Sequence, residues 1–181
     1  MQDTRAALLR LLRRDAVLRG SFVLSSGQTS DYYLDARLVT LSAAGSHLVG
    51  RHFLQVIDTE SIDCVAGLTV GADPIVSAIA TMAGSDGISV DGLIVRKSAK
   101  DHGAGRRIEG PWRPGLRVAV VDDTLTTGAS ALLAAEAIQQ EGGTVCGVYA
   151  LIDREQGARQ AVEAAGHQFT SLFTAGELLA L

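Results

Sequence analysis

The fold of this chain is decided by residues 118–130, which read Val118-Ala119-Val120-Val121-Asp122-Asp123-Thr124-Leu125-Thr126-Thr127-Gly128-Ala129-Ser130. The apolar, mostly β-branched residues 118–121 predict a strand that is buried on both faces, as in a parallel sheet. Two carboxylates follow at its carboxyl end, where open α/β sheets bind their ligands. Hydroxyl side chains and Gly128 then lead into an alanine-rich helix. The stretch therefore predicts an α/β fold with a ligand site at this strand end.

The turn at residues 124–130 predicts a site for a phosphate group. Its backbone N–H groups, its hydroxyls and the positive end of the helix dipole all favour an anion. Asp122 and Asp123 cannot bind that phosphate, but their oxygens can accept hydrogen bonds from vicinal sugar hydroxyls. Together these features suggest a ribose 5-phosphate site. The alternative, a strand that ends in two solvated aspartates before an ordinary helix, suits a bare Asp-Asp better than the whole run.

Composition narrows the class of protein. The chain has 181 residues, 47% of them hydrophobic, which suits one α/β domain with a sizeable core. A net charge of −4 gives no basic field for nucleic acid or a membrane surface, and no segment has the apolar length needed to cross a bilayer. The N-terminus leads directly into an amphipathic helix without a signal-like apolar region, so we expect a cytoplasmic location. Cys64 and Cys146 fall in predicted buried strands, where we expect reduced thiols.

Other segments complete the pattern. Apolar runs predict short strands at residues 22–24 and 32–35 and buried strands at 64–67, 90–96, 144–152 and 168–172. Ser42 predicts the start of one helix, and Asp73 followed by Pro74 predicts an N-cap and the first position of another. Tyr32 and Tyr33 point to opposite faces of their strand, so one can pack in the core while the other lines a pocket.

The loop at residues 97–110 is long, rich in glycine and cationic. It carries Lys97, Lys100 and His102, and it lacks the apolar residues needed to fold by itself. Loops of this length without secondary structure are commonly functional lids. A solvated loop without function is the alternative.

Four ordered motifs resemble those of one enzyme family. Residues 118–130 are similar to the 5-phosphoribosyl 1-diphosphate (PRPP) signature of type I phosphoribosyltransferases, an apolar strand, two acids and T-T-G-x-S. Orotate phosphoribosyltransferases carry the other three, which resemble residues 22–33 (F-x-x-x-S-G-x-x-S-x-Y-Y), 96–103 (R-K-x-x-K-x-H-G) and 153–157 (D-R-x-x-G). The resemblance therefore extends from Phe22 to Gly157.

The resemblance implies the type I phosphoribosyltransferase fold, a central parallel sheet flanked by helices with a small N-terminal hood and a flexible lid loop. We expect a single domain over residues 1–181, with the hood at 1–40 and the α/β core at 41–181. The implied reaction converts orotate and PRPP to orotidine 5′-phosphate and diphosphate in de novo pyrimidine (UMP) biosynthesis. The implied cofactor is Mg²⁺ carried by PRPP, without a metal ligand set from the protein.

The resemblance also implies roles for individual residues. Catalysis falls to Lys100, Asp122 and Asp123, and orotate binding to Tyr32, Tyr33, Thr126 and Arg154, whose planar guanidinium suits a carboxylate on a flat ring. An ion pair with Asp153 or Glu155 is the competing role for Arg154. PRPP binding involves Arg96, Lys97, Lys100, His102, Asp122, Asp123, Thr124, Leu125, Thr126, Thr127, Gly128, Ala129 and Ser130. The family forms homodimers in which the lid of one subunit closes over its partner's site, with small-molecule substrates and neither nucleic acid nor membrane as a partner.

Two departures from the family pattern concern charge. Relatives often carry Lys or Arg in the hood turn, where Ser25, Gln28 and Thr29 of this chain are neutral. Some relatives carry a Lys in the diphosphate-binding loop and a Gly at the position of Ala72; this chain has neither, and Asp73 adds a negative charge. We therefore expect much of the positive charge that faces diphosphate to come from residues 97–110. A transferase for another nucleobase and a non-catalytic PRPP-sensing regulator are the alternatives, and such regulators need a DNA-binding module that the short N-terminal helix does not supply.

Overall fold

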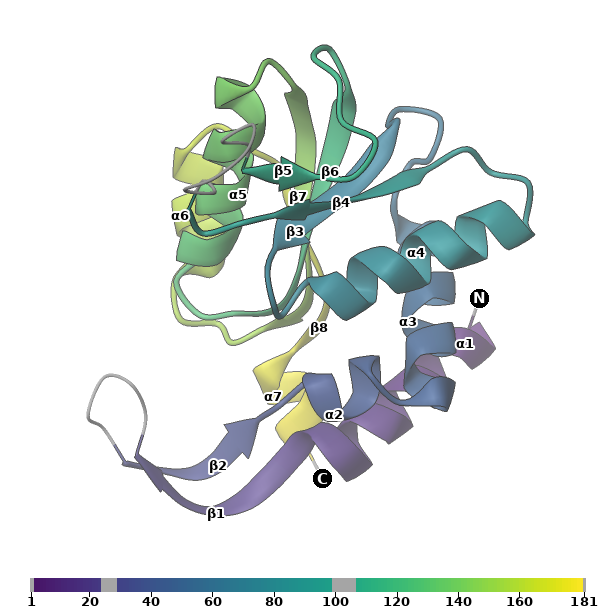
Figure 1. The fold of residues 1–181 in the computed structure, drawn as a ribbon. Helices are drawn as coiled ribbons and strands as arrows, with labels where there is room; N and C mark the ends of the chain where they lie inside the picture. The colour runs from purple at the N-terminus through teal and green to yellow at the C-terminus, as the bar shows by residue number, and fades with distance from the viewer. Residues whose placement is uncertain (1, 24–28, 99–106, 181) are drawn as a thin grey trace.

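A six-stranded sheet forms the centre of the computed structural model, which describes residues 2–23, 29–98 and 107–180 (Figure 1). Its strand order is β5-β4-β3-β6-β7-β8, and all neighbours are parallel except β4 and β5. The strands are β3 (Cys64–Leu68), β4 (Asp91–Val95), β5 (Ile108–Glu109), β6 (Arg117–Leu125), β7 (Thr144–Asp153) and β8 (Phe169–Thr174). The central parallel sheet flanked by helices confirms the predicted fold class.

The strand order reverses between β3 and β6. From β3 the chain continues outward through β4 to β5, whereas from β6 it continues through β7 to β8 on the other side. The loops that leave β3 and β6 therefore diverge, one to α4 (Asp73–Ser85) and the other to α5 (Ala129–Gln140). Such a switch point opens a crevice at the carboxyl ends of the strands, and this is where α/β proteins bind ligands.

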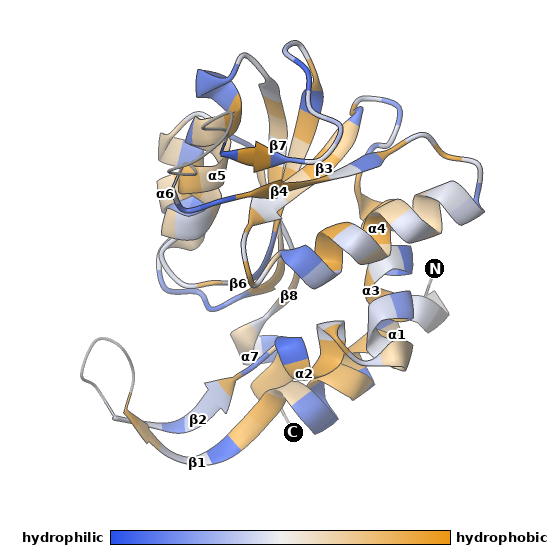
Figure 2. Cartoon of the chain, viewed as in Figure 1, coloured by the Kyte–Doolittle hydropathy of each residue, from blue (hydrophilic) through white to orange (hydrophobic). Residues whose placement is uncertain are grey.

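Helices cover both faces of the sheet (Figure 1). On one face lie α1 (Gln2–Leu11), α3 (Ala43–Val56) and α4, and on the other lie α5 and α6 (Ala158–Ala164). Successive residues of a strand point to opposite faces of the sheet. Ala119 and Val121 accordingly pack with the first set of helices, and Val118 and Val120 pack with the second. In keeping with this burial, strands β3 and β4 are coloured mostly as hydrophobic (Figure 2). Among the helices of the described residues, none is long and apolar enough to cross a membrane.

A β-hairpin projects from this body (Figure 1). It consists of β1 (Val17–Val23) and β2 (Thr29–Leu34), which pair antiparallel, and it follows the short π-helical turn η1 (Leu12–Ala16). The buried side chains of Leu12, Ala16 and Leu34 join its base to the core formed with α1 and α3. After β2 the chain turns through α2 (Arg37–Thr40) into α3, where Ser42 caps the helix as predicted by accepting a hydrogen bond from Gly45 N.

The start of α4 differs from the prediction. The sequence predicts Asp73 at the N-cap, but Ala72 occupies that position and Asp73 is the first helical residue. The Asp73 carboxylate instead accepts a hydrogen bond from Thr69 Oγ1 at 2.8 Å. The peptide bond between Thr69 and Val70 is cis. Pro74, predicted at the first helical position, is the second residue of the helix and still lies in its first turn.

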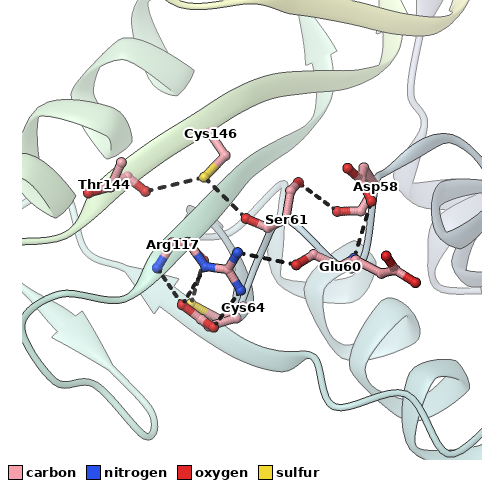
Figure 3. A network of polar contacts seen from close by, with 8 residues as sticks. Asp58, Glu60, Ser61, Cys64, Arg117, Thr144 and Cys146 are labelled. Atoms are coloured by element: carbon pink, nitrogen blue, oxygen red, sulfur yellow. Dashed lines mark hydrogen bonds and ion pairs between the residues drawn. The ribbon is translucent and has the colours of Figure 1, made fainter.

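At the end of the sheet opposite the crevice, where β3 and β6 begin, polar contacts join the strands to the preceding loop (Figure 3). Arg117, at the start of β6, pairs with Asp63 at 3.0 Å and donates to the Glu60 carbonyl at 3.2 Å. Cys64 and Cys146 are free thiols, of which Cys64 is buried as expected and Cys146 is only partly buried. Burial raises the pKa of Cys64 to about 12, which leaves this thiol unreactive.

The last helix of the chain contacts the first one. Helix α7 (Ala175–Leu179) is capped by Thr174, whose hydroxyl accepts from Glu177 N at 3.1 Å. The Glu177 carboxylate pairs with Arg5 of α1 at 2.7 Å, and the Arg5 guanidinium lies over the Phe173 ring. These contacts close the layer that contains α1 and α3.

Candidate active site

A cavity of about 900 Å³ lies between the carboxyl ends of β3, β6 and β7 and the hairpin. This volume is typical of sites that hold a small molecule or cofactor. Its wall combines the turn after β6, the segment after β7, the loop after β3 and the end of β2. The lining residues are Val23, Tyr33, Leu34, Asp35, Ala36, Arg37, Gly71, Asp123, Thr124, Thr126, Thr127, Arg154 and Gln156.

The two acids of the central motif lie within β6, which extends to Leu125 and not only to residue 121 as predicted. Asp122 is 4% exposed, and its Oδ2 accepts a hydrogen bond from Ser130 Oγ at 2.6 Å. Asp123 lines the cavity, and its Oδ1 accepts from Thr124 N at 2.7 Å. The strand alternation thus gives the two carboxylates different surroundings, one inside the turn and one in the cavity.

Burial perturbs both carboxyl groups. It raises the pKa of Asp122 to about 7, an effect that the hydrogen bond from Ser130 partly opposes. Burial also raises the pKa of Asp123, although the Thr124 N–H and the Arg37 charge lower it. Perturbed carboxyl groups of this kind gather at functional sites, where donors from a ligand replace lost water. Without a ligand, the folded protein binds extra protons here, so its stability falls as the pH rises from the ordinary Asp value through the raised one.

Gly71, in the loop after β3, makes close contact with the Asp123 carboxylate. A Cβ at position 71 would lie 2.8 Å from Asp123 Oδ1 and 3.1 Å from Oδ2. The loop after β3 therefore forms one wall of the acid site, and it can do so because the residue there has no side chain.

The turn after β6 has the geometry of an anion site. Gly128 has φ of 83° and is the N-cap of α5, so the chain enters the helix through a left-handed conformation that favours glycine. The amides of residues 128–131 have no acceptor within the helix and can serve a ligand. Thr126 and Thr127 line the cavity beside them.

Arg154 stands next to this turn because β7 pairs with β6 in register, with Leu125 opposite Asp153. Its N–H donates to the Leu125 carbonyl at 2.9 Å, and its guanidinium lies 5.9 Å from the centre of the Tyr32 ring. In the described part of the chain it forms no ion pair, and its buried Nε has no hydrogen-bond partner. The competing ion pair is therefore absent there, since Asp153 accepts from Glu155 N and Glu155 from Gly176 N.

Comparison with known proteins decides the family. The chain is 45% identical to an orotate phosphoribosyltransferase of Synechocystis sp. over 98% of its own length and 90% of the relative's. It is 45% identical to the enzyme of Mycobacterium tuberculosis, with 96% of each chain covered. The crystal structure of the M. tuberculosis H37Rv enzyme in complex with PRPP aligns with a TM-score of 0.83 at 40% identity, covering 97% of this chain and 98% of that one. No family model matches the chain.

This chain belongs to the orotate phosphoribosyltransferase family. It therefore has the type I phosphoribosyltransferase fold, and the resemblance inferred from its four motifs is confirmed. The family is one of transferases that act in pyrimidine synthesis.

The structure places the remaining predicted residues of this orotate phosphoribosyltransferase family member at different distances from the cavity. Tyr33 lines it, whereas Tyr32 packs against the core. The Leu125 side chain is buried, so only its backbone is available to a ligand. The Ser130 hydroxyl is turned to Asp122, which leaves its N–H for a ligand, and Ala129 is exposed.

The cationic loop is only partly described. Arg96 and Lys97 are not among the lining residues, and Arg96 pairs with Glu109 at 3.6 Å. Glu109 belongs to β5, a strand that lies within the predicted loop and pairs with β4. Lys100 and His102 lie outside the described residues.

Besides apolar wall residues, four lining positions were missed by the sequence prediction, namely Asp35, Arg37, Gly71 and Gln156. Asp35 and Arg37 follow Tyr33 closely in the sequence, just after β2. An acidic and a basic residue so near a tyrosine expected to line a pocket could have indicated that they line it too. The place of Gly71 in the cavity wall could not be predicted, because nothing in the sequence indicates that it faces the Asp123 side chain.

Proposed function

We propose that this protein transfers the phosphoribosyl group of PRPP to orotate, forming orotidine 5′-phosphate and diphosphate in de novo UMP synthesis. The observation that carries the proposal is the cavity at the switch point, where the acid pair, the phosphate-type turn and Arg154 converge. Family membership supplies the substrate class, and a known relative has been crystallised with PRPP.

We assign the ribose 5-phosphate part of PRPP to the carboxyl end of β6 and to the turn that follows this strand. The free amides of residues 128–131 and the hydroxyls of Thr126 and Thr127 would bind the 5-phosphate. Asp122 and Asp123 would accept hydrogen bonds from the ribose hydroxyls, which replaces the water that both carboxyl groups lose by burial. Phosphate binding far from the reacting carbon then supplies binding energy that can be used to orient it.

Orotate would bind beside this ribose. The Arg154 guanidinium, which forms no ion pair within the described residues, can form a bidentate pair with the orotate carboxylate. Tyr33 would cover the pyrimidine from the hairpin, with Tyr32 supporting Arg154 from the side and Thr126 adding a polar contact.

The reaction breaks the bond between the anomeric carbon and the diphosphate oxygen, and the diphosphate leaves with the bonding electron pair. A pyrimidine nitrogen forms the new bond to this carbon and gives up its proton. Positive charge develops on the ribose, and the carboxylates of Asp122 and Asp123 stabilise it. Negative charge develops on the leaving diphosphate, and we assign its neutralisation to Arg96, Lys97, Lys100 and His102. Of these, Lys100 is the proposed catalytic cation.

The described residues fit a Mg²⁺ ion that arrives with PRPP. They contain no group of three or more side chains able to hold a metal, but Asp123 faces the cavity. Mg²⁺ is commonly held by one or two carboxylates together with substrate phosphates. When bound, it would supply positive charge at the leaving diphosphate.

We also propose a homodimer located in the cytoplasm. As in the family that the chain resembles, the lid loop of one subunit would close over its partner's cavity, so that Lys100 and Asp123 of one site come from different chains. The substrates are small molecules, and neither nucleic acid nor membrane is a partner.

Steady-state assays with PRPP and Mg²⁺ test the proposed function. Orotate should be consumed with release of diphosphate, while adenine, hypoxanthine and uracil should not react. Turnover of another base in place of orotate would favour a transferase of different specificity. No turnover, together with PRPP-dependent DNA binding in a gel-shift assay, would favour the regulator.

A further inference from the structure

The described wall of the cavity carries little positive charge for its proposed substrates. Its charged side chains are two arginines, Arg37 and Arg154, and two aspartates, Asp35 and Asp123. In the proposed function, which this inference extends, Arg154 binds orotate and the turn after β6 binds the 5-phosphate. The loop after β3 offers the diphosphate no cation of its own, because residues 69–72 are neutral and Asp73 is acidic. Arg37 is the remaining cation of the described wall.

The Arg37 guanidinium is held along one edge. Asp35 Oδ1 accepts from Arg37 N at 3.1 Å and from Nε at 2.9 Å, and Asp35 Oδ2 accepts from Nη2 at 3.2 Å. A guanidinium has five N–H donors, so the pair with Asp35 leaves donors on the other edge for a ligand. The side chain is 44% exposed, and it lines the cavity, so a ligand in the cavity can reach it.

Arg37 also lies between two cavities. Besides the main cavity, it lines a second cavity of about 570 Å³ together with Val70, Asp73 and Pro74 of the loop after β3 and the start of α4. It is the residue common to the described walls of both cavities. Its charge also acts on Asp123, whose carboxylate touches Gly71 of the same loop.

The strand order places Arg37 and Arg154 on opposite sides of the acid pair. Strand β6 carries the aspartates, β7 on one side leads to Arg154, and β3 on the other side leads to the loop beside Arg37. In a displacement at the anomeric carbon, the entering base and the leaving group occupy opposite faces of the ribose. With orotate at Arg154, the leaving diphosphate lies toward the β3 side.

We propose that Arg37 binds the diphosphate group of PRPP, with Asp35 as the residue that positions its guanidinium. An exposed arginine–aspartate pair contributes little to stability by itself. Arg37 thus supplies, from the hairpin side, a cation that the loop after β3 does not carry.

Isothermal titration of the full-length protein with diphosphate in the presence of Mg²⁺, and separately with ribose 5-phosphate, tests this role. Arg37→Gln should weaken diphosphate binding by about 10–100-fold, the loss expected for a charged hydrogen bond, and leave ribose 5-phosphate within about twofold. Arg37→Lys should restore part of the affinity, because it keeps the charge but not the fork. Asp35→Asn should weaken diphosphate binding less than Arg37→Gln.

Arg51→Gln is the matched control, since Arg51 also pairs with an aspartate, Asp86, and is 39% exposed, but lies away from the cavity. It should leave both affinities within about twofold. Wild-type diphosphate affinity in Arg37→Gln, or an equal loss for both ligands, would overturn the proposal. Failure of the proposed function is distinguished separately, because it would appear as a wild-type protein that binds diphosphate but does not turn over orotate.

Discussion

Substitution of Gly71 by alanine is a sharp test of how the acid site is built. The new methyl would lie 2.8 Å from Asp123 Oδ1 and 3.0 Å from its Cγ, closer than ordinary contact. The carboxylate must therefore move by about 0.5 Å, which disturbs its 2.7 Å hydrogen bond from Thr124 N. Misplacement of a positioned group by about 1 Å can cost about a hundredfold in rate, so we expect kcat/KM to fall by about tenfold, or about 1.4 kcal/mol.

The assay compares kcat/KM for PRPP with thermal stability. Gly84→Ala is the control, because Gly84 lies in α4 and a Cβ added there would meet no atom within 4 Å. Alanine at this position should keep activity and stabilise the helix. A Gly71→Ala variant with kcat/KM within about twofold of wild type would refute the reasoning. A loss explained by a parallel fall in Tm would refute it as well.

Three further predictions concern the proposed site. Asp122→Asn should raise the free energy of unfolding of the ligand-free protein by about 1–3 kcal/mol near pH 8 and leave it almost unchanged near pH 4, because burial raises the pKa of this carboxyl. Denaturant titrations at both pH values measure this, and an equal change at both would contradict it. Arg154→Ala should raise KM for orotate by at least about tenfold and KM for PRPP much less, whereas equal effects would indicate a structural role. Mixed subunits of inactive Lys100→Ala and Asp123→Asn should recover about a quarter of wild-type activity if sites are shared across a dimer, because about half the dimers are mixed and each has one intact site. No recovery despite proven exchange would exclude sharing.

The central strands of the sheet could be predicted from the sequence because they are buried on both faces. Runs such as residues 118–121 and 64–67 contain little except apolar residues, and a short run of this kind between turn signals indicates a strand of a parallel sheet. The predicted end of β6 is too early, since the pattern stops at the first carboxylate while backbone pairing with β7 continues to Leu125. Strand β5 was missed because a two-residue strand is defined by its partner β4 and carries almost no periodicity.

The residues of the candidate site also differ in whether they could be predicted from the sequence. The turn after β6 and Arg154 could be predicted because each is a local motif at the end of a strand. Arg37 and Gly71 could not, because their place in the cavity depends on how the hairpin and the loop after β3 meet in space. The expected N-cap role of Asp73 was wrong for a related reason, since its carboxylate accepts a hydrogen bond from the Thr69 hydroxyl, a contact that depends on the conformation of the whole loop.

The central claim, that the cavity at the switch point binds the nucleotide product, is tested most directly by a crystal structure with orotidine 5′-phosphate. The 5-phosphate should lie on the amides of residues 128–131, the ribose hydroxyls within hydrogen-bond distance of Asp122 or Asp123, and the pyrimidine carboxylate on the Arg154 guanidinium. A nucleotide bound outside this cavity, or bound within it with the carboxylate away from Arg154, would contradict the claim.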